Sequence, residues 1–205
     1  MAQRGWGIAG KVLTTLLVAG MAIAAVAAFR IVKHGVSARD KPTAAEGAIA
    51  GALRHFAVPR DARAMKNPVV LTGAVLAEGR AHWADHCAAC HGNDGKGDTE
   101  VGRGLYPKVP DMSDGSADLS DGELFYIITN GVRLTGMPGW GDPRDARSSV
   151  QTWHLVHFIR HLPKITPAEL EQMKQMNPIS PMERKEKKEE DEFLSGDDHK
   201  SPTPR

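Results

Sequence analysis

The sequence predicts an all-α protein with a compact helical domain, an N-terminal apolar helix and a disordered C-terminal tail. Apolar residues recur at helical spacing in the middle of the chain, and helix-capping signals precede several of these stretches. The chain has 205 residues, enough for one globular domain plus extensions. It contains only two cysteines, so a disulfide framework is excluded as the basis of the fold.

The first segment, residues 1–33, has the pattern of a membrane anchor. An uncharged run of 18 residues extends from Val12 to Phe29, with basic residues on both sides. At about 1.5 Å per residue the run spans roughly 27 Å, close to a hydrocarbon core of about 30 Å. A cleaved signal peptide is the alternative, since Ala25 and Ala27 provide a small-x-small site, but its apolar stretch is usually only about 7–15 residues long. We expect an uncleaved anchor.

Residues 34–69 are expected to form a tether with one short helix. Thr43 and Glu46 have capping-box spacing. Apolar residues follow at helical intervals, which predicts an amphipathic helix from about Ala44 to Phe56. Prolines then interrupt regular structure. The helix is expected to be a spacer or a brace, with a dedicated docking helix as the alternative.

The last segment, residues 177–205, is predicted to be a disordered charged tail. It contains the mixed-charge run ERKEKKEEDE and few apolar residues. Such a segment buries too little surface to offset the entropy lost on ordering. The compact domain is therefore expected over residues 70–176.

The pentapeptide CAACH, from Cys87 to His91, is the most specific motif in the chain. Cys-x-x-Cys-His is the attachment signal for c-type haem, in which two thiols add to the porphyrin vinyl groups and the adjacent imidazole ligates the iron. A thioredoxin-like redox pair would need a βαβ context, whereas the flanking sequence is helical. A structural zinc site needs four ligands, usually with a second pair at matching spacing. We expect one covalently attached haem c on Cys87 and Cys90, with its iron bound by His91.

A predicted helix leads into this motif. Its apolar face is defined by residues at steps of three, four and four, and one of them is a glycine. A glycine inside a helix costs up to about 1 kcal/mol relative to alanine, so it indicates a close approach by another part of the chain. The residues on this face are Leu76, Gly79, Trp83 and Cys87.

A second predicted helix, capped by Ser148 or Ser149 and running to Pro163, is the candidate for that approach. We expect it to cross the first helix at the glycine and to place Phe158 or Trp153 against the tryptophan there.

A third predicted helix lies between these two in the sequence. Ser120 and Glu123 form a capping box at its start, and Asn130-Gly131 ends it. Its apolar residues are expected to form one wall of the haem pocket.

In this order, GRAHWADHCAACHG, a Gly-rich loop, GMPGW and WHLVHFIRHL resemble a class I cytochrome c. That family has a glycine eight residues and an aromatic residue four residues before the first haem cysteine, which Gly79 and Trp83 match. It supplies a distal methionine, often as Met-Pro, from a loop before the last helix, which Met137-Pro138 matches. The resemblance covers about Val75 to Leu162 and implies a small all-α haem domain.

Met137 is therefore the expected sixth ligand of the iron. Gly136, Pro138 and Gly139 keep it on a loop, unlike a core methionine on a helical stripe. Met112 is the other candidate in the domain, but no turn chemistry presents it.

Histidines are frequent on the two helices that are expected to cross. The pairs His82/His86 and His157/His161 have i, i+4 spacing, which suits a surface metal ion. We expect instead that these residues and His154 lie on a solvated helix face, with a bis-histidine haem as a further alternative.

Two loops are expected near the haem. The segment HGNDGKGD lacks the phosphate-loop pattern and is interpreted as a flexible turn after His91. Buried propionates need hydrogen-bond donors, and Arg103, Tyr106 and Trp140 are candidates from their loop positions.

These features predict an electron carrier and not an enzyme. His/Met ligation leaves no open position on the iron, and a methionine ligand raises the reduction potential. A haem enzyme or gas sensor, and a subunit of a respiratory or dehydrogenase complex, are the alternatives. The formal net charge of +1 gives no argument for nucleic-acid binding. The expected partners are redox proteins and the membrane, with no small-molecule substrate.

The side of the membrane is indicated by two conflicting signals. Positive charges are at least as dense after the apolar run as before it, which would place the rest of the chain in the cytoplasm. Haem attachment to CAACH takes place outside the cytoplasm, and this motif is the more specific signal. We expect a single-pass protein of the cytoplasmic (inner) membrane with its haem domain on the periplasmic side, in an extracytoplasmic redox chain.

Overall fold

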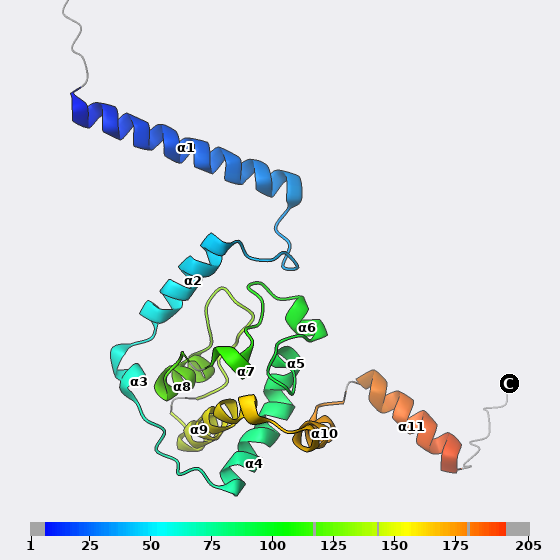
Figure 1. Cartoon of the computed structure of the whole chain (residues 1–205). Coiled ribbons are helices and arrows are strands. Elements are labelled where there is room, and N and C mark those ends of the chain that lie inside the picture. Colours follow the sequence, from blue (N-terminus) through cyan, green and yellow to red (C-terminus); the bar gives the residue numbers. More distant parts are fainter. Residues whose placement is uncertain (1–6, 117, 143, 180, 196–205) are drawn as a thin grey trace, which may run out of the picture. The chain divides into compact units, whose positions relative to one another are not determined.

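The computed structural model describes residues 7–116, 118–142, 144–179 and 181–195 (Figure 1). Over these residues the chain is helical and contains no strand, which confirms the all-α prediction. Two units are distinguished, Met1–Lys41 and Pro42–Arg205. The described elements are α1 (Ile8–His34), α2 (Ala44–Ala57), α3 (Arg60–Ala64), α4 (Gly73–His82), η1 (Trp83–Cys87), α5 (Ala88–His91), α6 (Glu100–Arg103), α7 (Met112–Gly115), α8 (Asp121–Asn130), α9 (Ala146–His161), η2 (Leu162–Lys164), α10 (Pro167–Met176) and α11 (Pro181–Ser195).

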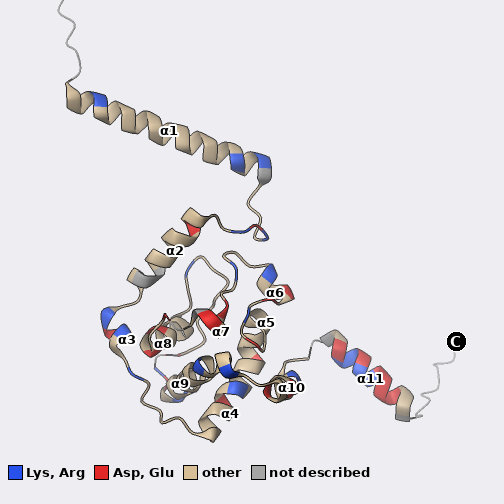
Figure 2. Ribbon diagram, viewed as in Figure 1, with Lys and Arg blue, Asp and Glu red and all other residues tan. Residues whose placement is uncertain are grey.

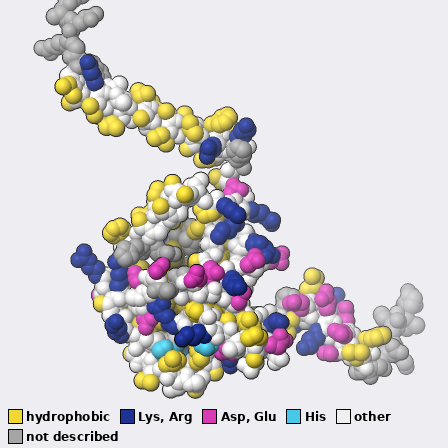
Figure 3. Space-filling model, in the orientation of Figure 1, with side chains coloured by type: hydrophobic (Ala, Val, Ile, Leu, Met, Phe, Trp, Pro, Cys, Tyr) yellow, Lys and Arg dark blue, Asp and Glu magenta, His cyan; other side chains and the backbone are white. Residues whose placement is uncertain are grey.

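The first unit contains the apolar helix α1. It extends beyond the uncharged run at both ends. An 18-residue window within Ile8–Lys33 has a mean hydropathy of 2.3, and none of that window is buried. Figure 3 shows hydrophobic side chains along its length. By length and composition α1 is able to cross a membrane, although a signal sequence would have the same properties.

The capping signals expected at α2 and α8 are both confirmed. At α2, the Thr43 amide donates to the Glu46 carboxylate at 2.7 Å, and the Glu46 amide donates to Thr43 Oγ1 at 3.3 Å. The first of these bonds lowers the pKa of Glu46. At α8, Ser120 and Glu123 form the same reciprocal pair. Each box satisfies amides that have no partner within the helix.

The end of the expected tether packs against the domain through α3. Gly122 of α8 lies so close to the backbone of Ala62 that it has no room for a side chain. Ser120 Oγ donates to the Arg63 carbonyl at 3.0 Å, and Asn67 Nδ2 donates to the Trp153 carbonyl at 2.9 Å. Residues 62–67 are thus attached to α8 and α9, and act as a brace.

The predicted crossing at Gly79, between the helix that leads into CAACH (α4) and the helix that ends before Pro163 (α9), is confirmed. A Cβ atom on Gly79 of α4 would collide with the carbonyl group of His154 and lie 3.1 Å from Phe158 Cβ. The rings of Trp83 and Phe158 are in contact, with centroids 5.8 Å apart. Trp153 is not at this contact, because its ring stacks on Phe125 with centroids 4.2 Å apart.

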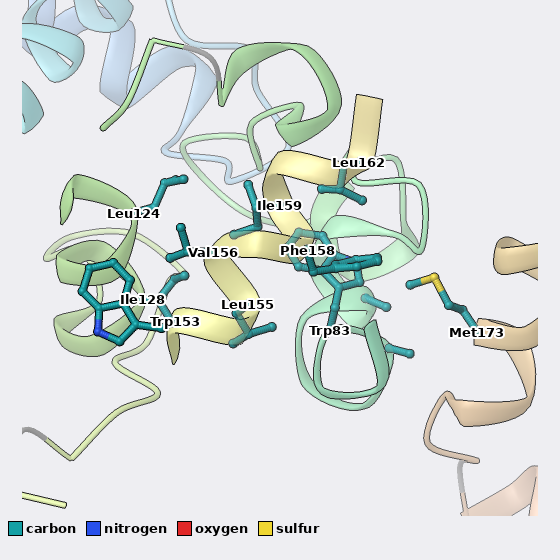
Figure 4. Close-up of a cluster of buried hydrophobic side chains, with 12 residues drawn as sticks. Trp83, Leu124, Ile128, Trp153, Leu155, Val156, Phe158, Ile159, Leu162 and Met173 are labelled. Carbon is teal, nitrogen blue, oxygen red and sulfur yellow. The ribbon is translucent and has the colours of Figure 1, made fainter. Parts of the chain in front are cut away.

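The hydrophobic core surrounds this crossing (Figure 4). Phe158 and Val156 of α9 are fully buried, and α8 contributes Leu124 and Ile128 from the other side. Met173 of α10 is also fully buried and packs against the same cluster. The core therefore joins α4, η1, α8, α9 and α10.

The start of α9 differs from the expectation. Asp145, and not Ser148 or Ser149, is the N-cap, and its carboxylate accepts from the Arg147 amide at 2.9 Å. Ser148 Oγ instead accepts from the Asp142 amide at 2.9 Å. The loop before α9 folds back onto the first turn of the helix through the bond from Asp142 to Ser148. The helix therefore begins at Ala146, three residues earlier than a cap at Ser148 would place its start.

Residues 181–195 differ from the expected disordered tail, since they form α11. Residues 182–194 are exposed, and Figure 2 shows both signs of charge along the helix. Lys185–Glu189 and Lys188–Glu192 are i, i+4 ion pairs at 3.6 Å, each of which supports a helix by about 0.2–0.5 kcal/mol. The prediction of disorder rests on the small apolar surface of this segment and leaves out the contribution of these ion pairs to helix stability. Residues 196–205 lie outside the described residues.

Replacing Gly79 with alanine is expected to destabilise the domain. Alanine is the better helix former by up to about 1 kcal/mol, but its methyl group would have to displace the backbone of α9, and overpacking of this kind costs about 1–3 kcal/mol. Thermal unfolding followed by circular dichroism measures the difference. Gly73→Ala in the same helix is the control, because open space surrounds that position. A Gly79→Ala melting temperature equal to that of the control would contradict the crossing.

Candidate functional site

The CAACH motif lies at the end of a helix whose geometry changes just before it. Helix α4 continues as the π-helical turn η1, Trp83–Cys87, and then as α5, which ends at His91. The Ala88 amide donates to the Trp83 carbonyl, five residues back. A π turn accommodates one extra residue and is frequent at functional sites. Here it turns Cys87 and the residues after it relative to the face of α4.

The His91 ring is held by the tryptophan at the start of this turn. The ring centroids of Trp83 and His91 are 5.4 Å apart, and Trp83 Nε1 donates to the Gly92 carbonyl at 2.9 Å. Burial lowers the pKa of His91, and the backbone of Pro110 partly opposes this. His91 Nδ1 is buried and makes no hydrogen bond of standard geometry. The imidazole is therefore kept neutral, which is the form that binds a metal ion.

The segment after His91 is folded and is not the flexible turn that was expected. The Gly97 amide donates to the His91 carbonyl at 2.7 Å. Thr99 Oγ1 donates to the carbonyls of Ala89 and Cys90 at 2.8 and 3.1 Å. These bonds satisfy the last carbonyls of α5, which no helical amide reaches. Positive φ angles at Gly92, Gly95 and Gly97 let the chain turn back this tightly.

Thr99 is a structural residue of the site that the sequence analysis missed. It also caps α6, where its hydroxyl accepts from the Gly102 amide at 2.9 Å. A threonine before Glu100 is an ordinary N-cap signal, so the sequence contained a sign of the cap. Its second role, on Cys90, depends on a tertiary contact.

The two cysteines are free and partly buried. Burial, and then the neighbouring Cys90, raise the pKa of Cys87 to about 12, and burial also raises the pKa of Cys90. Catalytic and redox-active cysteines have the opposite shift, because the thiolate is the reactive species. The environment therefore argues against a thioredoxin-like pair.

Met137 lies on a loop that folds back against the end of α8. The Val132 amide donates to the Met137 carbonyl at 3.0 Å, and the Trp140 amide donates to the Ile128 carbonyl at 2.9 Å. The Met137 amide itself donates to Thr135 Oγ1 at 3.1 Å. The side chain is half-buried. Met112, by contrast, packs against the hydrophobic core.

The three residues expected to donate to the haem propionates each contact a different partner in the structure. Arg103 pairs with Asp98 at 2.7 Å on the surface. A side-chain hydrogen bond connects Tyr106 to Glu46 of α2. The Trp140 ring contacts His86 edge-on, with centroids 5.4 Å apart. These contacts do not single out any of the three as a propionate ligand.

Most of the histidines on α9 are not on a solvated face, contrary to the expectation. His154 is only 8% exposed and its Nδ1 lies 2.9 Å from Glu78 Oε2. His157 and His161 are half-buried and hydrogen-bonded. The close crossing at Gly79 is the reason, because it covers the side of α9 that carries His154.

These residues fit a covalently bound haem. Two free thiols lie three residues apart, Cys87 at the end of η1 and Cys90 in α5. The imidazole of His91 follows Cys90 directly, and Met137 is presented on a separate ordered loop. Neutral nitrogen and thioether sulfur are ligands that suit haem iron.

The match to a family model agrees with this assignment. Residues 74–159 match the family model described as "Cytochrome C oxidase, cbb3-type, subunit III". No curated protein matches the chain. A solved structure from Kuenenia stuttgartiensis, described as a reducing HAO-like protein complex, Kustc0457/Kustc0458, is 20% identical with a TM-score of 0.40. The match covers 48% of this chain and 49% of that one, so this chain spans about half the length of its match.

The matched segment contains the CAACH motif and extends from the second residue of α4, through η1, α5, α6, α7 and α8, into most of α9. The family match implies electron transfer through covalently bound haem c. Residues 74–159 of this chain are therefore a cytochrome c domain, in a chain that also has a single N-terminal apolar helix.

Proposed function

We propose that this protein is a monohaem electron carrier in which Cys87 and Cys90 hold the haem and His91 and Met137 are its axial ligands. The observation that supports this most is the construction of the CAACH turn. Its imidazole is buried and neutral against Trp83, and its terminal carbonyls are capped by the following loop.

The chain provides rigid supports for both ligands. On the proximal side, Trp83 packs against His91 and is itself anchored to Gly92. On the distal side, backbone hydrogen bonds at Val132 and Trp140 attach the Met137 loop to α8. Ligands held in this way move little when the charge at the iron changes, which favours rapid electron transfer.

The bound haem would supply one-electron chemistry at a potential raised by the thioether ligand. With an imidazole on one side and a methionine on the other, no position is left for a substrate. The proposed role is therefore that of a carrier and not of an enzyme.

The proposed location is the cytoplasmic (inner) membrane. Helix α1 would act as a single-pass anchor, and the haem domain would lie on the periplasmic side, where covalent haem attachment takes place. Its apolar span of 26 residues is long enough for this. The electron donor and acceptor would be proteins of an extracytoplasmic redox chain.

A place as a subunit of a larger oxidoreductase complex is the second candidate. The matched family is described as subunit III of a cbb3-type oxidase, and a membrane anchor would keep this chain beside other membrane subunits. Electron transfer is the role in both cases. Native-mass analysis of detergent-solubilised membranes distinguishes a free carrier from a subunit.

Covalent attachment is expected to depend on the two thiols. Haem should remain with the polypeptide through acid-acetone extraction and denaturing electrophoresis, because thioether bonds survive both. The double variant Cys87→Ala with Cys90→Ala should lose this haem stain completely. Release of free haem from the unmutated protein would contradict the assignment.

Membrane association is expected to depend on α1. Washing membranes with high salt should leave the protein in the pellet, because apolar insertion is not screened by ions. A variant that begins after His34, exported with a cleavable signal, should be released as a soluble haem protein. A mature N-terminus at Ala28 in the unmutated protein would show that the helix is a signal peptide.

Met137→His is expected to keep the haem covalent and six-coordinate while lowering the reduction potential by a substantial part of the roughly 0.8 V range set by axial ligands. Met137→Ala should open a position that binds carbon monoxide, which the unmutated ferrous protein binds slowly or not at all. Redox titration and carbon monoxide difference spectra measure these changes.

Met112→Ala is the matched control for this series. It removes a methionine that packs against the core, so it should lower stability and leave the potential and carbon monoxide binding unchanged. Rapid carbon monoxide binding by the unmutated protein, with no effect of Met137→Ala, would favour a haem enzyme or sensor.

A further inference from the structure

A groove on the outer side of α4 and η1 contains an unusual number of metal-binding side chains. It has a volume of about 750 Å³ and lies where α4 and η1 face α9 and Trp140. Its lining includes three imidazoles and two carboxylates, and no lysine or arginine. These residues are Glu78, His82, Asp85, His86 and His154.

Two of the imidazoles are already close together. The ring centroids of His82 and His86 are 4.7 Å apart, which is near the spacing of two imidazoles that share one metal ion. The two residues lie on successive turns of the continuous α4–η1 helix, so the backbone holds both side chains on one face.

Carboxylates lie beside the Nδ1 atoms of two of the rings. His86 Nδ1 lies 3.2 Å from Asp85 Oδ2, and His154 Nδ1 lies 2.9 Å from Glu78 Oε2. In metal sites the histidine ligand usually donates its second ring N–H to a carboxylate, which leaves the other nitrogen for the metal. Over the described residues, no hydrogen bond engages Nε2 of His86 or His154.

The same spacing on α9 has a different outcome. His157 Nε2 donates to the Val69 carbonyl at 2.8 Å. His161 Nε2 lies 2.9 Å from Glu169 Oε1. Both Nε2 atoms are thus engaged within the protein, so neither Nε2 of the second i, i+4 pair is free to bind a metal ion.

We propose that His82 and His86 bind one exchangeable divalent transition-metal ion through their imidazoles, at a site separate from the haem. Imidazole ligands suit Cu²⁺, Ni²⁺ and Zn²⁺, and Cu²⁺ binds most tightly in this series. The carboxylates of Asp85 and Glu78 add negative charge. No three His, Cys, Asp or Glu side chains in the described part of the chain are grouped to hold an ion, so water completes the coordination and the ion exchanges.

The partial burial of the His82 side chain supports its role as a metal ligand. It lowers the pKa of His82, and the neighbouring His86 lowers it further. Because of this lower pKa, which Asp85 partly opposes, protons compete less with a metal ion for the imidazole nitrogen of His82.

The test uses the full-length haem protein in detergent, without a polyhistidine tag, and Cu²⁺ as the probe. Equilibrium dialysis should show one tight site, and the Cu²⁺ electron paramagnetic resonance spectrum should show nitrogen hyperfine splitting. His86→Gln and His82→Gln should each weaken this site at least tenfold. Asp85→Asn, which leaves both imidazoles in place and removes the negative charge beside His86 Nδ1, should weaken it about tenfold.

His157→Gln is the matched control, because its i, i+4 pair has no free Nε2. Its Cu²⁺ affinity should equal that of the unmutated protein. The haem absorbance spectrum reports that each variant is folded. Unchanged affinity in both His82→Gln and His86→Gln, or a loss of binding in His157→Gln alone, would overturn the proposal. Absence of a tight site in the unmutated protein would do so as well.

Discussion

The approach of α9 to the backbone of α4 at Gly79 is the contact on which the domain depends. A glycine at this position lets the carbonyl of His154 come against the helix, and this close approach brings the side chains around the crossing together. Trp83 and Phe158 reach each other, which adds about 0.5–1.5 kcal/mol to the burial of their surface. Trp83 then packs against His91. The proximal side of the site is therefore built directly on the crossing.

The short connections around the site are attached by hydrogen bonds to helix ends. Thr99 and Gly97 cap the carbonyls of the CAACH turn, and backbone bonds attach the Met137 loop to the end of α8. Each cap satisfies a polar group that would be costly to bury without a partner. In this way two segments outside the long helices, around Thr99 and around Met137, are attached to the helix ends by hydrogen bonds.

Helix starts and ends were predicted correctly where they depend on interactions between residues close in sequence. The capping boxes at Thr43 and Ser120, and the end of α8 at Gly131, were all predicted and are present. The close approach at Gly79 was also predictable, because a glycine in a helix has a cost that needs a compensating contact. The predictions differ from the structure where contacts with residues distant in sequence determine the local conformation. Asp145 replaced the expected serine caps of α9, and tertiary hydrogen bonds ordered the Gly-rich segment after His91.

The sequence by itself determined the all-α class, the haem attachment motif and the apolar helix, because each depends on spacing along the chain. It could not distinguish the two i, i+4 histidine pairs, which have the same spacing. Only the tertiary structure separates them: the carbonyl of Val69 and the carboxylate of Glu169 engage one pair, whereas the other faces an open groove. A side chain's free donor atoms are set by neighbours distant in sequence, and spacing contains no information about those neighbours.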